Sequence, residues 1–494
     1  MNRPKYYIST NNEFVIENYD SAPTFSSFFP GIAGIFGCPM WVFYANRGQC
    51  ITSAGVYDKN SALIEFQSAN KAYRTVALQG FRTFLKVDGK FYEPFSALGD
   101  RPRKMFILPH NLRLTEENTA LKLRVEVVYF TVPNEQFPAL ARVLKITNLG
   151  KKPRRIEVID GLPAMIPFGF DNDLLKRLST TIAAWSSVEN LKKNAPFYKL
   201  KIMPADVTET KLVRKGNFFL SFCRDKTPVK MIVDPALVFG EDTGLERPAN
   251  FLSAGAFRLP AEQLTEGFIP SAFTYKKFTL KDGFEIASLF GEIDSVELLN
   301  KLKKKIASRD YLTGKFLDNK TLIDDITARM KGITSHNSFD LYARNTFLDN
   351  VMRGGLPLIF DGKVVYVYYR KHGDMERDYN DFKLMPVYFS QGDGNYRDIN
   401  QNRRNDLFFN PDIGADNIFR YFNLVQLDGY NPLVVLGSKY FVREPGQAAG
   451  LLNKHLKAPG QELSALITQP FLLGAVLKKI ENSGVGYKTS RLEL

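Results

Sequence analysis

The sequence predicts a multidomain protein that is β-rich first and α-helical last, and three observations support this prediction. Its 494 residues suffice for about three domains at roughly 150 residues each, and 44% of them are apolar, enough for packed cores. Polar and apolar side chains alternate from about Asn12 to Asp294, which is typical of strands. Beyond Asp294, apolar residues recur at helical spacing instead. The three parts are considered in that order.

Residues 1–293 are expected to form an antiparallel β-sandwich. Leu123 and Val125, for example, alternate with charged residues, so they would line one face of a strand. The pair Asp88–Gly89 predicts a tight hairpin, because such pairs supply the positive backbone angles that short turns need. A second hairpin is predicted at residues 281–283. Many short strands separated by turn residues favour a large sandwich.

Residues 294–335 are expected to be a two-helix linker. Asp294 is the predicted N-cap of the first helix, whose apolar face carries Leu298, Leu302 and Ile306. The second helix carries Ile323 and Ile326 and ends at Gly332, since glycine commonly terminates helices.

Residues 336–494 are expected to be mainly helical. Helices are predicted over residues 338–353, 416–427 and 463–480, with breaks at Gly354–Gly355 and Asn431–Pro432. Helices with their loops take roughly 25 to 35 residues each, so about 160 residues hold five or six of them.

Composition and motifs exclude several classes of function. The net charge of +14 is spread along the chain and no recognition module accompanies it, so no nucleic-acid partner is expected. No stretch of about 18 apolar residues and no signal peptide is evident, and the three cysteines have no metal spacing, so we expect a cytoplasmic protein with no membrane partner. The four histidines are scattered, and serine-nucleophile and phosphate-loop motifs are absent, so no metal or organic cofactor is expected.

The densest polar stretch runs from Tyr368 to Pro411 and mixes carboxylates, amides and guanidiniums with aromatic residues. Sugars suit such a mixture, because their hydroxyls need paired donors and acceptors and their ring faces need apolar contact. Gly392, Gly394 and Gly414 are expected to allow tight turns and the close approach of a ligand. A solvated loop with internal ion pairs is the alternative.

Several long motifs resemble cellobiose-phosphorylase-type enzymes. In the N-terminal part these are residues 25–37 (FSSFFPGIAGIFG), 41–50 (WVFYANRGQC) and 66–73 (FQSANKAY). Residues 348–355 (LDNVMRGG), 372–379 (HGDMERDY) and 388–410 (YFSQGDGNYRDINQNRRNDLFFN) are similar to the larger branch that acts on β-1,3-glucans.

This resemblance implies a β-sandwich, a helical linker and an (α/α)6 barrel, here incomplete. The implied reaction is reversible, inverting phosphorolysis of cellobiose or β-1,3-gluco-oligosaccharides to α-glucose 1-phosphate, with inorganic phosphate as a substrate. An inverting glycosidase needs an acid for the leaving oxygen and a base for water. A phosphorylase replaces water by phosphate, so only the acid must come from protein.

The resemblance also implies substrate-binding residues. Arg397 and Asp398 match the Arg-Asp motif that holds the transferred glucosyl unit in that family. Gln401, Arg403, Arg404 and Asp406 follow as further candidates, either for binding sugar or phosphate or for bracing the loop.

The catalytic acid of that family lies in a Trp-Asn-Asp-like motif, but both tryptophans here, Trp41 and Trp185, fall in the β-rich part. A complete barrel also needs about 350 to 400 residues by the same estimate. The chain therefore resembles an N-terminal portion, whether a truncated product, a split subunit or a fragment. Its acid would come from a missing C-terminal part.

Three alternatives remain open. The chain could be a non-catalytic β-glucan-binding or accessory subunit. Alternatively, Asp378, Asp381 or Asp393 could serve as the acid if burial or a like charge raised its pKa. Nucleic-acid binding is the third alternative.

The partner expected by resemblance is a second copy, in a homodimer, or a complementary C-terminal subunit. The segment from Phe25 to Gly48 is the one expected at a dimer contact, although Trp41, Phe43 and Tyr44 fit buried strand positions better. An incomplete barrel would expose apolar helix faces, such as those of Phe419, Phe422 and Val425 or of Phe471, Leu472 and Val476. We therefore expect the chain alone to associate.

Overall fold

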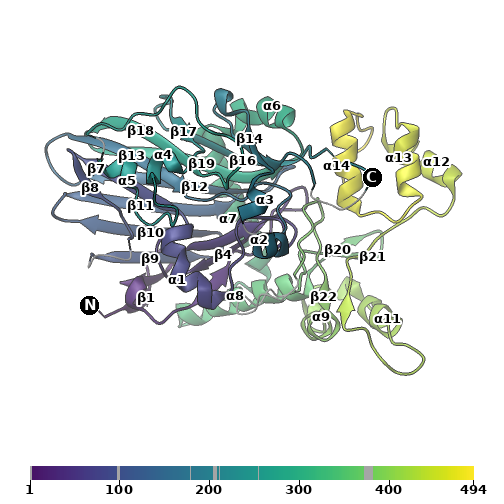
Figure 1. Cartoon of the computed structure of the whole chain (residues 1–494). Coiled ribbons are helices and arrows are strands. Elements are labelled where there is room, and N and C mark those ends of the chain that lie inside the picture. The colour runs from purple at the N-terminus through teal and green to yellow at the C-terminus, as the bar shows by residue number, and fades with distance from the viewer. Residues whose placement is uncertain are drawn as a thin grey trace.

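The computed structural model describes residues 3–96, 101–178, 180–203, 208–210, 212–253, 255–371 and 382–493. It combines a large antiparallel β region with helices, as the sequence predicts (Figure 1). The β region occupies residues up to Ile293, and the remainder is mainly helical. The prediction of mixed β and α architecture is confirmed. The (α/α)6 barrel and the exact domain boundaries stay predictions.

The β region contains a ten-stranded and a five-stranded antiparallel sheet. In spatial order, the ten strands are β1 (Lys5–Ile8), β2 (Phe14–Glu17), β9 (Arg103–Leu108), β10 (Asn111–Asn118), β11 (Leu123–Thr131), β12 (Ala139–Asn148), β19 (Gly283–Ile293), β16 (Gly216–Cys223), β15 (Phe197–Leu200) and β14 (Ser186–Glu189). The five are β17 (Lys230–Ile232), β18 (Ala272–Leu280), β13 (Arg154–Leu162), β7 (Arg82–Val87) and β8 (Lys90–Tyr92).

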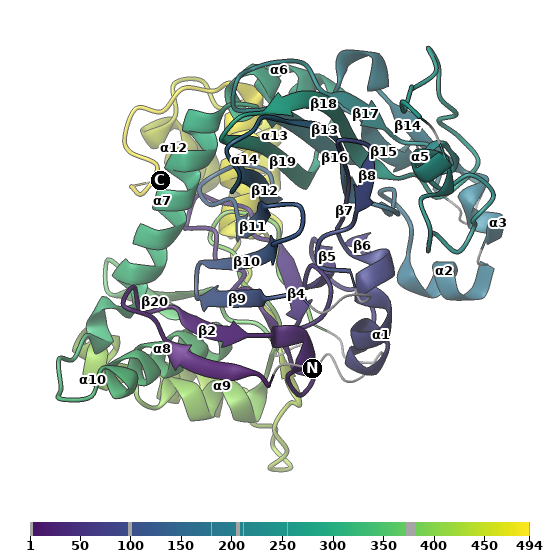
Figure 2. The same cartoon turned by 90° about the vertical axis from the view of Figure 1, so that its left-hand side faces the viewer.

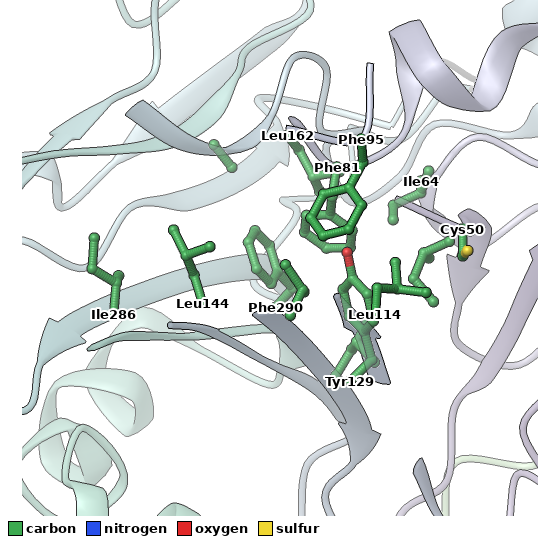
Figure 3. Close-up of a cluster of buried hydrophobic side chains, with 14 of the residues drawn as sticks. Cys50, Ile64, Phe81, Phe95, Leu114, Tyr129, Leu144, Leu162, Ile286 and Phe290 are labelled. Carbon is green, nitrogen blue, oxygen red and sulfur yellow. The ribbon is translucent and has the colours of Figure 1, made fainter. Parts of the chain in front are cut away.

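A shared apolar core joins these two sheets. Leu114 and Leu144 of the ten-stranded sheet belong to the same buried cluster as Leu162 of the five-stranded sheet (Figure 3). Leu85 and Val158 of the five-stranded sheet belong to it as well. The alternation read in the sequence is the cause, because Leu123, Val125 and Val127 are all fully buried and point to one face. This packing of two sheets over one core agrees with the predicted sandwich.

Turn chemistry fixes the register of one of the two predicted hairpins. Asp88 and Gly89 have φ angles of 51° and 86°, so the turn between β7 and β8 is the predicted tight turn. The second predicted hairpin, at residues 281–283, is wrong. β18 pairs with β13 and β17 in the five-stranded sheet, whereas β19 pairs with β12 and β16 in the ten-stranded sheet, so the turn at Asp282 connects the two sheets. The first hairpin is confirmed.

A four-stranded sheet connects the β region to the helical part. Its strands are β3 (Ser26–Phe28), β4 (Trp41–Ala45), β5 (Ile51–Gly55) and β6 (Ala62–Ile64). Trp41 and Phe43 are buried against Phe382, with ring centroids 5.5 and 5.6 Å away. Their expected role as buried strand residues is confirmed, and this contact lies within one chain.

Short helices lie between the strands of the β region. They are η1 (Tyr19–Ser21), α1 (Ala69–Gln79), α2 (Asn172–Leu178), α3 (Thr180–Ala183), η2 (Leu191–Lys193), α4 (Ala236–Phe239) and α5 (Ala249–Ser253).

The linker helices α6 (Val296–Ile306) and α7 (Arg309–Thr327) pack on the outer face of the ten-stranded sheet (Figure 2). The short helix η3 (Ala328–Met330) follows, and its Met330 packs with α8. The predicted N-cap was one residue too early. The Ser295 hydroxyl accepts a bond from the Leu298 backbone N–H at 3.2 Å, whereas Asp294 forms ion pairs with Lys215 and Lys478. The linker is therefore part of the packed structure.

The helical part contains more breaks than expected. Its elements are α8 (Asn337–Gly354), β20 (Leu356–Phe360), β21 (Lys363–Val367), β22 (Gly394–Asn395), α9 (Tyr396–Arg403), α10 (Asp406–Phe409), η4 (Pro411–Ile413), α11 (Asp416–Phe422), β23 (Val434–Val435), α12 (Pro445–His455), α13 (Gln461–Ile467) and α14 (Leu473–Ser483). The helix predicted over 338–353 is confirmed as α8. The helix predicted over 416–427 ends early, at Phe422.

The single helix predicted over residues 463–480 is wrong, because α13 and α14 are separate. Pro470 lies between them and has no N–H for a helical bond, and its ring disfavours helical geometry at Gln469. The two helices pack with α12 around Leu452, Leu463 and Ile480. This group lies apart from α9 and α11 (Figure 1).

Candidate functional site

The candidate site is built on α9, which a close helix contact positions. Gly354, the last residue of α8, lies against α9, where an added Cβ would come within 3.0 Å of the Cβ of Asn402. Gly355 follows with a φ of 97°, which favours glycine. At the other end, Asn395 pairs with Val434 of β23 just before α9 begins. The Gly354–Gly355 pair thus ends α8 and brings α9 against it.

Asp398 and Arg397 form an oriented pair in the first turn of α9. Arg397 Nε donates to Asp398 Oδ1 at 3.2 Å, and Asn395 Nδ2 donates to Asp398 Oδ2 at 3.2 Å. The Arg397 side chain is 88% exposed, so solvent or a ligand reaches its remaining N–H groups. Each carboxylate oxygen has a second acceptor position. The pair therefore presents donors and acceptors together, as a sugar diol requires.

Gln401 and Arg404 extend this exposed face. They follow Arg397 at helical spacings of four and seven, and all three are exposed. Two guanidiniums and one amide therefore lie along the solvent face of α9 and its C-cap. The opposite face carries Ile399 and Arg403, which are buried.

Arg403 is held in the interior by aromatic rings. Its guanidinium carbon lies 3.5 Å from the ring centroid of Tyr366 and 5.0 Å from that of Tyr369, and Nε donates to the Gly354 carbonyl at 2.5 Å. Only 4% of the residue is exposed. The sequence left open whether Arg403 binds a ligand or braces the loop. This geometry agrees with bracing, because Arg403 joins α9 to α8 and β21.

Asp406 lies next to this cluster and has an altered pKa. The Tyr366 hydroxyl donates to Asp406 Oδ2 at 2.8 Å, and Asn417 Nδ2 donates to the same hydroxyl at 2.8 Å. Burial raises the pKa of Asp406 to about 6, and the Tyr366 bond and the charge of Arg403 only partly offset that effect. The candidates Arg403 and Asp406 are thus brought together around Tyr366, below the exposed face of α9.

Asp406→Asn is expected to remove a pH dependence of stability. Because the pKa of Asp406 is higher in the folded state, its protonation favours folding below about pH 4, and this contribution is lost as the pH rises to about 6. The wild type should therefore lose up to roughly 3 kcal/mol relative to the variant between pH 4 and 7, at about 1.4 kcal/mol per pKa unit. Urea unfolding of both proteins across this range measures the difference, and a constant difference would contradict the assignment.

Gly392, Gly394 and Gly414 were expected to allow tight turns and the close approach of a ligand, and two of them serve a different purpose. A Cβ at Gly392 would collide with the carbonyl oxygen of Lys383, and one at Gly394 with the side chain of Ile399. These glycines allow the chain to approach itself, so the expected approach of a ligand at these two positions is not what the structure shows. Gly414 has a φ of 54° and open space around it, in agreement with a turn.

Of the three aspartates considered as alternative general acids, only Asp393 lies among the described residues. Asp393 forms an ion pair with Lys383 at 3.1 Å, so its carboxyl group already has a cationic partner. Asp378 and Asp381 lie outside the described residues, as does the motif 372–379.

His110, His455 and Cys38 lie at buried positions. Burial lowers the pKa of His110 to about 4 and raises that of the Cys38 thiol to about 12. His455 Nδ1 lies 2.8 Å from the Thr489 hydroxyl. Over the described ranges, no group of three His, Cys, Asp or Glu residues could hold a metal ion, and no helix is long and apolar enough to cross a membrane.

Sequence reasoning missed Asn395 and Arg370. The spacing of Asn395 and Asp398 is that of an N-cap and the N3 position, a signal that could have identified Asn395. Arg370 is buried, with its guanidinium carbon 4.9 Å from the ring centroid of Phe28 and Nη2 3.4 Å from the Phe29 carbonyl oxygen. It joins residues 28–29 to the helical part, and no local pattern marks such a distant contact.

Comparison with known proteins shows a distant likeness to solved structures. No protein family model matches the sequence, and no curated protein matches it. One solved structure that resembles the chain is a bacterial glucoamylase complexed with acarbose, at 12% identity and a TM-score of 0.38. The alignment covers 87% of this chain and 56% of that chain, so this chain spans little more than half the length of its neighbour. A likeness this distant carries no argument about the reaction.

Proposed function

We propose that the chain is a carbohydrate-active protein that binds β-glucosides at the N-terminal turn of α9 and takes part in their reversible, inverting phosphorolysis. The observation that carries the proposal is the Arg397–Asp398 pair, in which Asn395 and Arg397 orient both carboxylate oxygens while the guanidinium stays exposed. Such an array can accept from and donate to neighbouring sugar hydroxyls. The motifs that resemble β-glucan phosphorylases name the substrate class, cellobiose or β-1,3-gluco-oligosaccharides.

In this mechanism the pair holds the glucosyl unit while phosphate attacks its anomeric carbon from the face opposite the leaving group. Binding and orientation of this kind supply much of the rate of a two-substrate reaction. Arg404 and Gln401, on the same exposed face, would contact phosphate or the next sugar unit. Phosphate is a substrate here, and the proposal requires no cofactor.

The general acid is proposed to come from outside this chain. In the described part of the polar stretch, Asp393 pairs with Lys383, Asp398 pairs with Arg397, and Asp406 lies under Tyr366. None of these three carboxyl groups is free of a partner within the described residues. The same observation favours the second candidate function, a β-glucan-binding or accessory subunit without chemistry of its own.

Phosphate release from α-glucose 1-phosphate, with laminaribiose or cellobiose as acceptor, tests the reaction. We expect no release from the chain alone and release when the protein encoded immediately downstream is added, since the acid is then supplied. Release by the chain alone would contradict the placement of the acid. If neither assay releases phosphate, only the binding function is left.

A further inference from the structure

A cavity of about 930 Å³ opens at one edge of the β region, away from α9. It lies between β14, the edge strand of the ten-stranded sheet, and β17, the edge strand of the five-stranded sheet. The two strands lie close together in both views of the molecule (Figures 1 and 2). A volume of this size is typical of ligand sites.

The walls of the cavity are fixed by hydrogen bonds. On one side, Asn190 Nδ2 donates to the Ala195 carbonyl at 2.9 Å and to Asn300 Oδ1 of α6 at 3.1 Å, which anchors η2. On the other side, Gln263 accepts from the Val233 N–H at 3.0 Å and donates to the Met231 carbonyl at 2.8 Å. The cavity is therefore part of the folded framework.

The floor of the cavity is the sandwich core itself. Val188, Val229 and Met231 line the cavity and belong to the main buried cluster, and Leu191 packs against that cluster. All of the lining residues are described, and no aromatic side chain is among them. A nucleobase or a neutral pyranose would find no ring to stack on here.

The rim of the cavity is basic. It carries Lys192, Lys193 and Lys230 against one acidic residue, Glu262. None of these three lysines has an ion-pair partner within the described ranges, and all three are exposed. Lys303 of α6, which does not line the cavity, donates to the Lys193 carbonyl. Unpaired cations around a preformed cavity attract an anion.

We propose that this cavity is a binding site for an anionic oligosaccharide, whose carboxylate or sulfate groups pair with Lys192, Lys193 and Lys230. Its hydroxyls would meet the amide of Asn194 and the hydroxyl of Thr265, which also line the cavity. Charge and hydrogen bonding carry the recognition, in keeping with the lack of an aromatic platform. The site is independent of the one proposed on α9.

Calorimetric titration of the full chain with tetragalacturonate and with a sulfated tetrasaccharide tests the proposal, with maltotetraose as the neutral control. We expect at least one anionic probe to bind, with an affinity that falls as salt is raised, and the neutral probe not to bind. The probe that binds identifies carboxylate or sulfate as the ligand group. Failure of both anionic probes to bind would overturn the proposal.

Two variants separate the cavity from the overall basic charge. Lys192→Glu combined with Lys193→Glu should weaken binding at least tenfold, whereas Lys151→Glu with Lys152→Glu, the same charge change in the exposed β12–β13 turn, should leave it unchanged. Ala261→Trp, which fills the cavity without changing charge, should also abolish binding. Equal losses in both charge variants, or unchanged binding in Ala261→Trp, would show that the ligand is not in the cavity. Binding through α9 would instead respond to Asp398→Asn.

Discussion

Replacement of Arg142 by alanine is expected to lower the free energy of unfolding by about 3–5 kcal/mol, the range for breaking a buried ion pair. Arg142 and Asp160 join the two sheets at the centre of the β region, and their side chains are 0% and 1% exposed. Arg142 Nε and Nη2 contact the two carboxylate oxygens at 3.1 and 2.6 Å. Without the guanidinium, the carboxylate of Asp160 would stay buried and uncompensated, which is the cause of the loss.

Denaturant unfolding measures this loss of stability. Two further variants show whether the loss comes from the buried ion pair. Arg124→Ala, on the exposed pair with Glu117, should change stability by less than about 1 kcal/mol. Combining Arg142→Ala with Asp160→Ala should restore part of the loss, because no unpaired charge remains. A loss at Arg142 as small as that at Arg124 would contradict the assigned role of the buried pair.

The chain alone is expected to associate in solution through its exposed apolar residues. It exposes 24168 Å² of surface, whereas a folded monomer of 56.1 kDa exposes roughly 18500 Å² by the usual scaling. Many large apolar side chains between residues 407 and 441 contribute: Leu407, Phe408, Ile418, Phe419, Phe422, Val425, Leu427, Tyr430, Leu433, Leu436 and Phe441. Exposed apolar area of this extent drives association.

Light scattering during gel filtration measures the association. Phe408→Ser with Phe422→Ser, at positions that are 83% and 74% exposed, should shift the chain toward monomer, whereas Leu264→Ser, 68% exposed on the β region, should not. A monodisperse wild-type monomer would contradict the expectation. The prediction of exposed apolar faces is confirmed at Phe419, Phe422 and Val425, but Val476 is buried among α12, α13 and α14.

Local signals account for the features of the fold that sequence reasoning predicted. Asp88–Gly89 permits one type of turn, and the buried apolar residues Phe347, Leu348, Val351 and Met352 of α8 recur at helical spacing, so both signals lie in the local sequence. The hairpin of β20 and β21 was missed because its strands lie within a stretch that reads as a helix connection. Their pairing also depends on packing against Phe347 and Phe389.

For the candidate site, sequence reasoning predicted the residue types but could not sort them. Arg397, Arg403 and Arg404 look alike in the sequence, yet helix geometry places Arg397 and Arg404 in solvent and Arg403 inside. What decides the position of Arg403 is Tyr366, on a strand that sequence reasoning did not find. The contact between Gly392 and the Lys383 carbonyl is equally invisible without the fold.

Equilibrium titration of laminaritetraose tests the central claim, that the Arg397–Asp398 pair binds a glucosyl unit, most directly. Wild-type chain is expected to bind, and Asp398→Asn is expected to bind at least about tenfold more weakly, because hydrogen bonds to a charged group contribute about 1.5–3 kcal/mol each. Asp412→Asn, an exposed carboxylate on η4, serves as the control and should bind like wild type. Equal affinity in all three proteins, or no binding by the wild type, would contradict the claim.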